Sequence, residues 1–565
     1  MNNPFVQEIV KVVSRKTDLP PQQVEQLLEI PPDEKLGDYA FPCFSLAKKF
    51  KKAPDKIAAE LASQIKTGNL FSEIKSVGGY INFFVDKVKL AELVLGQILK
   101  QDSNYGSDAI GKGKTIPIDY SSPNIAKPFG IGHLRSTVIG HSLKLLFEKL
   151  SYSVVGINHL GDWGTQFGKL VVAYKKWGKE ILKQDSVTEL YNLYTKFHEE
   201  AEKNPALEEE ARLEFQKLEK GDKENRELWE KFRKISLDEF KRIYKILEIE
   251  FEAYAGESFY ENMIEQTVQE LQEKKLTQIS QDALVVNLDQ FNLPPCLIKK
   301  KDESTLYATR DITAAIYRYK TYNFYKNLYV VGNSQRLHFQ QVFTVVKLMG
   351  YNWADNCIHV DFGWVKFEEE ILSSRKGNII LLEDVLDKSI NLAGQIIEEK
   401  NPELENKKGV AEEVGIGAVV FAYLARRRNK DFDFVWEEVL NFEGETGPYL
   451  QYTHARLCSL QKKYEKKIED RADFSLLKGK EEISLIKILE DFPRTIQRAL
   501  DGYEPAVLSN YLVRLASTFN TYYQNIKIIT EEEEKTRAKM LLVKSAQVVL
   551  KEGLRLLGLK APEQM

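Results

Sequence analysis

The stretch from Asp119 to Thr137 constrains the fold more than any other part of the sequence. It begins where the apolar run Thr115–Asp119 ends, and such a run is typical of a short buried strand. Apolar residues then recur at helical spacing as far as Leu150, so we expect a helix to begin near Gly132. A strand that leads through a loop into a helix is the unit of open parallel sheets. Their ligands bind at the carboxyl edge, where this loop would lie.

The residue types in this loop suit an anionic ligand. Gly130 and Gly132 let the backbone approach a ligand closely, and a helix N-terminus offers unpaired N–H groups to an anion. His133 falls in the first turn of the expected helix, where its ring could donate to a phosphate. Taken alone, the run Gly130-Ile-Gly-His133 is equally compatible with a glycine-rich turn that holds an ordinary histidine.

The complete stretch is more specific. Ser121-Ser-Pro-Asn-Ile-Ala-Lys-Pro-Phe129, followed by Gly-Ile-Gly-His133, resembles the first signature of the class I aminoacyl-tRNA synthetases in its arginyl-tRNA synthetase form. The resemblance implies that Gly130, Gly132 and His133 contact ATP and that His133 is catalytic. The signature usually reads His-Ile-Gly-His, and here its first histidine is Gly130. A phosphate contact made by that histidine is therefore absent or supplied by another residue.

Length and composition limit the class of protein. A chain of 565 residues is too long for one core, and 43% hydrophobic with 29% charged residues is typical of a soluble globular protein. The net charge of -3 gives no overall attraction to nucleic acid, so RNA contacts would need local basic patches. We find neither a secretion signal nor an apolar stretch that could span a bilayer. The scattered cysteines argue against disulfides or a structural zinc site and favour a reducing cytoplasm: Cys43, Cys296, Cys357 and Cys458.

We expect a multidomain α/β protein with four regions. Residues 1–105 would form an α+β domain, and residues 106–365 a doubly wound, Rossmann-type catalytic domain with a helical insertion at about 169–282. Residues 366–430 would hold a signature loop and a region that contacts the tRNA stem. Residues 431–565 would form an all-α helical bundle. The doubly wound pattern rests on strand-like runs that alternate with helices: Ser153–His159, Ala283–Asn287, Leu328–Val331 and Ile358–Val360.

A second constellation is Ser304-Thr-Leu-Tyr-Ala-Thr-Arg-Asp311. Tyr307 and Asp311 are four residues apart, so they share one face if the segment is helical. Asp311 could also simply cap a helix that begins at the next residue. The run resembles arginyl-tRNA synthetases, in which the matching tyrosine and aspartate contact the substrate arginine. The resemblance extends to further arginine-contacting positions: Asp119, Asn124 and Gln335.

The chemistry of arginine agrees with this resemblance. A guanidinium presents a planar fork of donors that carboxylate and carbonyl oxygens satisfy, and the α-ammonium needs an acceptor of its own. Asp119 and Asp311 would supply two carboxylates for the two cationic ends. The sequence does not decide which carboxylate takes which end, although we favour Asp311 for the guanidinium.

A third constellation is Ile371-Leu-Ser-Ser-Arg-Lys-Gly-Asn378. Its hydroxyls, cations and glycine suit a polyphosphate, although an ordinary surface loop can have the same composition. It resembles the second class I signature, Lys-Met-Ser-Lys-Ser, which implies ATP contacts from Ser373, Ser374, Arg375 and Lys376 and a catalytic role for Lys376. Ser374 stands where the signature has its second lysine. In such relatives a lysine upstream of the first signature is thought to substitute, and here that residue is Lys127.

Two histidines and two strand residues complete the expected sites. The resemblance places His338 in the ATP pocket, whereas we expect His159 to be a neutral core histidine. Tyr80 and Asn82 occupy positions at which the N-terminal domain of relatives reads a base at the tRNA corner, although they could be ordinary strand residues.

The segment Gly444–Arg456 resembles the start of the family's α-helical anticodon-binding domain. Helical periodicity alone would leave dimerisation, regulation and RNA binding open for this region.

The resemblance implies a ligase. It would activate L-arginine with ATP and Mg²⁺ to arginyl-adenylate and transfer the arginyl group to the 3′-terminal adenosine of tRNA(Arg). The partners would be tRNA(Arg), L-arginine and ATP, in a cytoplasmic monomer without membrane contact or structural zinc.

Three alternatives remain open. A cysteinyl enzyme of the same class would need a zinc–thiolate site, which the scattered cysteines disfavour. A dinucleotide-dependent oxidoreductase would need a third glycine where Arg135 stands. An inactive RNA-binding paralogue is conceivable because of Gly130 and Ser374.

Overall fold

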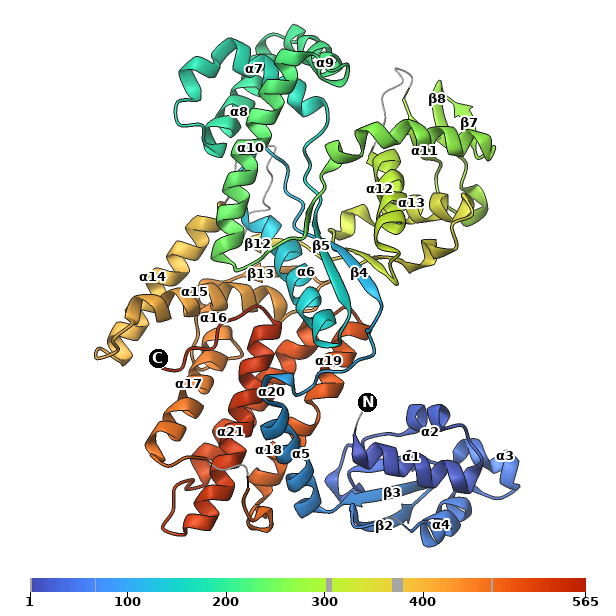
Figure 1. The fold of residues 1–565 in the computed structure, drawn as a ribbon, viewed down its shortest axis with the longest axis vertical. Helices are drawn as coiled ribbons and strands as arrows, with labels where there is room; N and C mark the ends of the chain where they lie inside the picture. Colours follow the sequence, from blue (N-terminus) through green and yellow to red (C-terminus); the bar gives the residue numbers. More distant parts are fainter. Residues whose placement is uncertain (1–2, 67, 301–306, 368–379, 469–470) are drawn as a thin grey trace. The chain divides into compact units, whose positions relative to one another are not determined.

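The computed structural model describes residues 3–66, 68–300, 307–367, 380–468 and 471–565 (Figure 1). The chain divides into two compact units. Unit 1 comprises Met1–Gly106, Arg456–Thr495 and Val513–Glu552, and unit 2 comprises Ser107–Ala455, Ile496–Leu512 and Gly553–Met565. The helical residues after Phe434 are therefore shared between the two units.

The N-terminal part of unit 1 is built on a three-stranded antiparallel sheet. Its order is β1-β3-β2, with β1 at Tyr39–Pro42, β2 at Phe71–Val77 and β3 at Tyr80–Val85. Gly78 adopts a φ of +58° in the tight turn between β2 and β3, a conformation that glycine reaches without strain. Helices cover this sheet: α1 (Pro4–Thr17), α2 (Pro21–Leu27), α3 (Ala47–Phe50) and α4 (Pro54–Gln64).

Longer helices complete unit 1. The N-terminal sheet is tied to them by Tyr39, whose hydroxyl donates to the partly buried carboxylate of Glu490 across 2.6 Å. Tyr105 stacks on Phe492 with ring centroids 6.1 Å apart. The helices that lie wholly or partly in this unit are α5 (Lys87–Gln101), α17 (Gly447–Lys463), α18 (Lys480–Glu490), α19 (Phe492–Asp501), α20 (Ala506–Asn525) and α21 (Glu533–Leu556).

Unit 2 is organised around a five-stranded parallel sheet of order β11-β10-β4-β5-β6. The winding reverses between β4 and β10, and such a reversal opens the crevice in which doubly wound folds bind ligands. The predicted strand and helix at the first signature are confirmed, because β4 ends at Asp119 and α6 begins at Ile131. The strands are β4 (Thr115–Asp119), β5 (Ser153–Asn158), β6 (Ala253–Tyr254), β10 (Asn327–Tyr329) and β11 (Cys357–His359).

One predicted strand belongs elsewhere. The run Ala283–Asn287 was expected in the parallel sheet, but β8 (Ala283–Val286) lies in a separate antiparallel sheet between β7 (Thr277–Ser280) and β9 (Cys296–Lys299). Gln281 and Asp282 both have positive φ and form a two-residue hairpin turn between β7 and β8. So short a connection can join only antiparallel strands.

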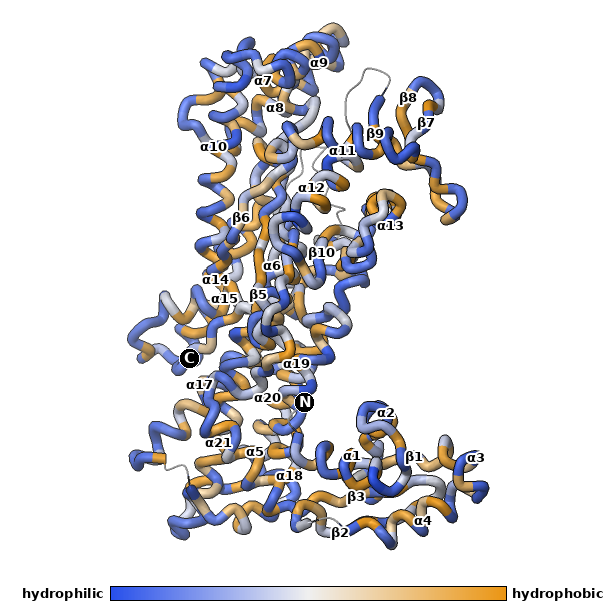
Figure 2. The backbone as a smooth tube through the Cα atoms, turned by 45° about the vertical axis from the view of Figure 1, so that its right-hand side comes forward, coloured by the Kyte–Doolittle hydropathy of each residue, from blue (hydrophilic) through white to orange (hydrophobic). Residues whose placement is uncertain are grey.

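Helices surround the parallel sheet and form the expected insertion after β5. Hydrophobic and hydrophilic residues alternate along α10, as an amphipathic helix requires (Figure 2). A two-stranded parallel sheet pairs β12 (Val365–Phe367) with β13 (Phe432–Phe434). None of the helices in the described ranges is long and apolar enough to cross a membrane. The helices are α6 (Ile131–Lys149), α7 (Thr165–Ile181), α8 (Val187–Lys203), α9 (Ala206–Glu219), α10 (Lys223–Ile246), α11 (Glu261–Glu273), α12 (Tyr307–Tyr322), α13 (Arg336–Leu348), α14 (Leu382–Lys400), α15 (Lys407–Leu424) and α16 (Trp436–Val439).

Candidate active site

Asp119 lies at the carboxyl end of β4, beside the reversal point of the sheet. Its Oδ2 accepts from Nη2 of Arg318 across 2.7 Å, and its Oδ1 accepts from the hydroxyl of Ser122 across 3.0 Å. Asp119 is 4% exposed and Arg318 is 1% exposed. Asp119 was expected to supply a carboxylate to one cationic end of arginine, and the structure shows that Arg318 already balances its charge.

Asp311 is the more accessible carboxylate. It lies inside α12, one turn after Tyr307, so the predicted shared face is confirmed and the alternative of a helix cap is wrong. Oδ2 of Asp311 is 2.6 Å from Nε2 of His338, and its Oδ1 is 3.8 Å from Nε2 of His159. Burial would raise the pKa of Asp311, but the hydrogen bond from His338 and the nearby cationic groups hold it below its usual value.

Of these two histidines, His159 differs from expectation. His159 was expected to be a core residue, but it follows β5, is only partly buried, and turns one ring nitrogen toward Asp311. Its other nitrogen, Nδ1, is 2.8 Å from the carbonyl oxygen of Ala255. His338 was assigned to the ATP pocket, and the structure places its ring directly on Asp311. The two imidazoles therefore hold the Asp311 carboxylate from two sides.

Glu257 is an acidic residue of this site that the sequence reasoning missed. It begins a short 3-10 helix, Glu257–Tyr260, which packs against α12. Its Oε2 is buried and has no hydrogen-bond partner among the described residues. Burial, with smaller contributions from the charges of Asp311 and Asp162, raises the pKa of Glu257 to about 8, although the charge of Arg310 lowers it. The residue falls inside the insertion to which no chemistry was assigned, and its only signal was an acid that closely follows a short strand.

The first signature forms the N-terminus of α6. The backbone N–H of Gly130 donates to Nδ1 of His133 across 3.1 Å, and the His133 ring packs edge-on against Phe129. Burial and the charge of Lys127 lower the pKa of His133 to about 4, so the ring is neutral at pH 7. Because Nδ1 is the acceptor, the proton of the neutral ring is on Nε2, which leaves an N–H donor for an anionic ligand.

The remaining candidates in unit 2 lie on loops and helix ends. Asn124 and Gln335 are both exposed and follow β4 and β10, two neighbouring strands that end at the same sheet edge. Tyr307 is 59% exposed, and Gly132 is exposed at the start of α6. Nζ of Lys127 lies 5.4 Å from the ring centroid of Tyr194.

The second signature lies outside the described residues, but the chain on its far side is described. The predicted contacts Ser373, Ser374, Arg375 and Lys376 all fall within 368–379. Immediately after this range, the carbonyl oxygen of Ile380 accepts from the N–H of Ile131, and the N–H of Leu382 donates to the carbonyl oxygen of Phe129, each across 3.0 Å. The residues that follow the second signature are therefore bound to the backbone of the first.

The candidate tRNA contacts lie on β3 in unit 1. The ring of Tyr80 is partly exposed and meets the ring of Phe44 edge-on at 5.2 Å, and Phe44 is itself exposed. Asn82 is 2% exposed, so its amide does not face solvent. Phe44 was not singled out from the sequence, although it precedes the basic cluster from Lys48 to Lys52.

Three known families match separate parts of the chain. Residues 94–436 match the family described as tRNA synthetases class I (R), catalytic domain. Residues 450–565 match the DALR anticodon binding domain, and residues 4–85 match the arginyl tRNA synthetase N terminal domain.

Individual proteins also match this chain over nearly its full length. The arginine–tRNA ligase of Halothermothrix orenii is 50% identical over 563 residues, which cover 99% of this chain and 100% of that protein. The arginine–tRNA ligase of Clostridium botulinum (strain Alaska E43) is 48% identical with the same coverage. Among solved structures, the arginyl-tRNA synthetase of Thermus thermophilus superposes with a TM-score of 0.85 at 24% identity, covering 100% of both chains. That of Plasmodium falciparum superposes with a TM-score of 0.82 at 26% identity, covering 100% of this chain and 98% of the other.

The parallel sheet with its reversal point, the signature turn at α6 and the catalytic-domain match define a class I aminoacyl-tRNA synthetase. Within that class, the chain belongs to the arginyl-tRNA synthetase family.

Proposed function

We propose that this chain attaches L-arginine to tRNA(Arg). It activates arginine with ATP to give arginyl-adenylate and pyrophosphate, and then transfers the arginyl group to a ribose hydroxyl of the 3′-terminal adenosine of the tRNA, with release of AMP. The observation that carries the proposal is the pair of neighbouring acidic residues at α12, Asp311 on the helix and Glu257 on the 3-10 helix packed against it, in a chain whose close relatives are arginine–tRNA ligases.

The pocket offers what a guanidinium requires. Asp311 is the accessible carboxylate, so we assign the guanidinium to it, with Tyr307 on the same helical face. The unpartnered oxygen of Glu257 supplies a further acceptor, and a cation beside it would favour its ionised form. Hydrogen bonds to charged groups contribute about 1.5–3 kcal/mol each, and a site built on such bonds can reject a mismatched substrate by roughly 10⁴–10⁵.

The α-ammonium is assigned to the neighbouring strand ends. Asn124 and Gln335 follow β4 and β10 and present exposed amides there. The charge of Asp119 is balanced by Arg318, so Asp119 does not act as an isolated negative charge. The α-ammonium is therefore bound mainly by neutral acceptors, whereas the guanidinium is bound by the charged Asp311.

Activation is a phosphoryl-group reaction that needs positioning and charge stabilisation. A carboxylate oxygen of arginine attacks the α-phosphorus of ATP, which enters as its magnesium complex, and pyrophosphate leaves. The Nε2–H of His133 donates to the phosphates, with Gly130 and Gly132 allowing close approach. Lys127 stabilises the charge on the leaving group, together with the predicted contacts from Ser373 to Lys376.

The tRNA is proposed to bind at both ends of the chain. Tyr80, together with Phe44, offers aromatic surface for a base of the tRNA corner, while the helical region matching the DALR domain takes the anticodon. Asn82 remains assigned to the same base, although it would have to become exposed to reach it. We further propose that the protein acts as a cytoplasmic monomer.

The test is attachment of labelled arginine to total tRNA by the full-length protein. Labelled lysine and cysteine serve as controls, because they distinguish an arginyl enzyme from other members of the class. Acid-stable labelling of tRNA with arginine alone is the expected result. Labelling with either control amino acid, or with none of the three, would contradict the proposal.

A further inference from the structure

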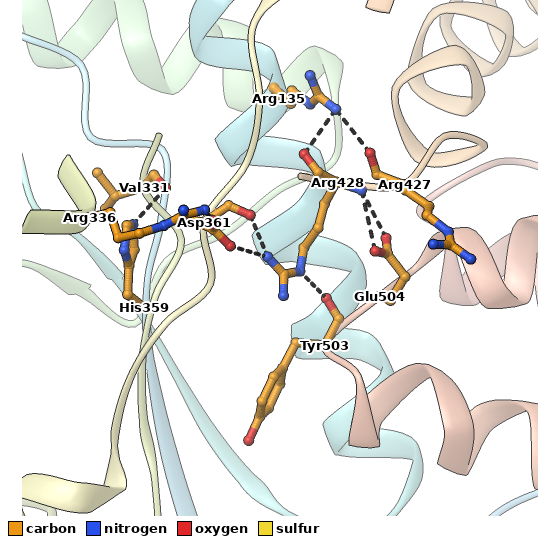
Figure 3. A network of polar contacts seen from close by, with 9 residues as sticks. All are labelled: Arg135, Val331, Arg336, His359, Asp361, Arg427, Arg428, Tyr503 and Glu504. Carbon is orange, nitrogen blue, oxygen red and sulfur yellow. Dashed lines mark hydrogen bonds and ion pairs between the residues drawn. The ribbon is translucent and has the colours of Figure 1, made fainter. Parts of the chain in front are cut away.

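The loop Arg427–Lys430, between α15 and β13, touches the helix of the first signature. Arg135 of α6 is buried and has no carboxylate partner among the described residues. Instead it donates to the carbonyl oxygen of Arg428 across 3.0 Å (Figure 3). It also donates to the carbonyl oxygen of Lys430 across 2.7 Å. It also donates to the carbonyl oxygens of Gly363 and Trp364. The backbone of this loop is therefore held in place by Arg135, a residue of the helix that carries the first signature.

The side chain of Arg428 extends away from Arg135 toward two other parts of unit 2. Its Nη1 donates to Oδ1 of Asp361 across 2.6 Å, and its Nε donates to the carbonyl oxygen of Tyr503 across 3.0 Å (Figure 3). Its backbone N–H donates to the Glu504 carboxylate, with Oε1 at 3.1 Å. Tyr503 and Glu504 join α19 to α20, inside the region that matches the anticodon-binding family.

Asp361 continues these contacts to the arginine pocket. It follows β11 and accepts a second hydrogen bond from Arg336, the first residue of α13. Gln335 immediately precedes Arg336, and His338, which holds Asp311, follows it by two residues. The hydrogen bonds from Arg336 and Arg428 outweigh burial and keep the pKa of Asp361 below its usual value, so the carboxylate is charged.

From these contacts we propose that Arg428 is a positioning residue for aminoacylation. It fixes the junction of α19 and α20 to Asp361, and through Asp361 it fixes the start of α13, where Gln335 and His338 meet the substrate pocket. The inference rests on the proposed function, since it names the residue that ties the tRNA-binding helices to the arginine site. In this role Arg428 acts on the arginine site through Asp361 rather than by direct contact with arginine or ATP.

Lys326 offers a matched control, because it also bonds to the junction of α19 and α20 but has no contact with the arginine site among the described residues. Nζ of Lys326 donates to the hydroxyl of the same Tyr503 across 2.7 Å. Lys326 precedes β10, so this contact lies at the amino end of the strand, opposite the substrate pocket. Losing it removes a bond to Tyr503 without disturbing Asp361 or α13.

The experiment compares Arg428→Met with Lys326→Met in the full-length protein. Turnover for arginine attachment to tRNA, the KM for arginine and the melting temperature are measured for each. Small displacements of positioning groups cost up to about 100-fold in rate, so Arg428→Met is expected to lower turnover by about 10- to 100-fold. Lys326→Met is expected to stay within about twofold of the unaltered protein, since its contact is remote from the pocket.

A second variant covers the case in which Arg428→Met does not fold. The side chain of Arg336 is 62% exposed, so Arg336→Met is expected to fold and still to lower turnover, because it releases Asp361 from α13. If both arginines act through Asp361, the loss in the double variant is smaller than the product of the single losses. Independent, multiplicative losses would overturn the proposal.

Two further outcomes separate the possible failures. Equal turnover in Arg428→Met and Lys326→Met would show that Arg428 only stabilises the packing at Tyr503 and does not position the arginine site. The inference would then be wrong, while the proposed function would stand. Absence of arginine attachment by the unaltered protein would instead remove the proposed function.

Discussion

Nη2 of Arg318 donates to Oδ2 of Asp119 across 2.7 Å, in a place where both side chains are buried. The pair joins the end of β4 to the helix that carries Tyr307 and Asp311. Because these two charges balance each other, the electrostatic attraction for a cationic substrate comes mainly from Asp311, whereas burial raises the pKa of Glu257 to about 8 and this carboxyl ionises only when a cation lies beside it. The two aspartates therefore have different roles.

We predict that Asp119→Asn destabilises the fold, whereas Asp311→Asn does not do so to the same extent. Removing one partner of a buried ion pair leaves an uncompensated charge and typically costs about 3–5 kcal/mol. Urea denaturation of both variants at pH 7 measures the difference in the free energy of unfolding. Equal stability of the two variants would show that Arg318 does not depend on Asp119.

The second prediction concerns the cation that replaces the missing signature lysine. Loss of one preorganised charge-stabilising group costs about 10²–10³ in rate, so Lys127→Ala should lower turnover by this factor with little change in the KM for arginine. Steady-state kinetics at saturating ATP check it. A larger loss in Lys376→Ala than in Lys127→Ala would identify Lys376 as the main cation.

The third prediction concerns acid stability. Burial and the charges of Lys144 and Arg555 lower the pKa of His141 from 6.5 to about 4. The unfolded chain therefore binds more protons than the folded chain between these values, so stability rises with pH across this window and is lost as the pH falls through it. Urea denaturation at pH 5 and pH 7 should show a smaller pH difference in His141→Gln than in the unaltered protein. An unchanged difference would mean that His141 does not contribute.

A structural feature could be predicted from the sequence when the residues that determine it lie close together along the chain. The strand ending at Asp119 and the helix after it were predictable because strand and helix periodicity are local properties. The shared face of Tyr307 and Asp311 followed from their spacing for the same reason. The hairpin of Gln281 and Asp282 was missed, because an apolar run does not reveal which sheet it joins.

The other features that the sequence did not predict depend on contacts between residues far apart along the chain. Arg318 lies 199 residues after Asp119, and nothing near either residue indicates their ion pair. Glu257 comes close to Asp311 only because the end of the insertion packs against α12. Asn82 alternates with core residues on β3, and its burial depends on contacts that strand periodicity does not specify.

The fourth prediction is that arginine activation requires tRNA. Gly130 and Ser374 replace two groups of the usual phosphate clamp, so remote tRNA contacts are expected to complete the site, an induced-fit use of binding energy. The measurement is arginine-dependent exchange of labelled pyrophosphate into ATP without tRNA, with intact tRNA, and with tRNA lacking its terminal adenosine. We expect exchange only with intact tRNA. Full exchange in its absence would contradict the prediction, and exchange with the truncated tRNA would assign the requirement to the tRNA body.

The most direct measurement is arginine attachment to a tRNA(Arg) transcript by the unaltered protein and by Asp311→Ala, over a range of arginine concentrations. We predict efficient attachment by the unaltered protein. In the variant, the KM for arginine should rise by at least the factor that corresponds to one charged hydrogen bond, about 1.5–3 kcal/mol, with the KM for ATP nearly unchanged. An unchanged arginine KM in Asp311→Ala, or preference of the unaltered protein for another amino acid, would contradict the account.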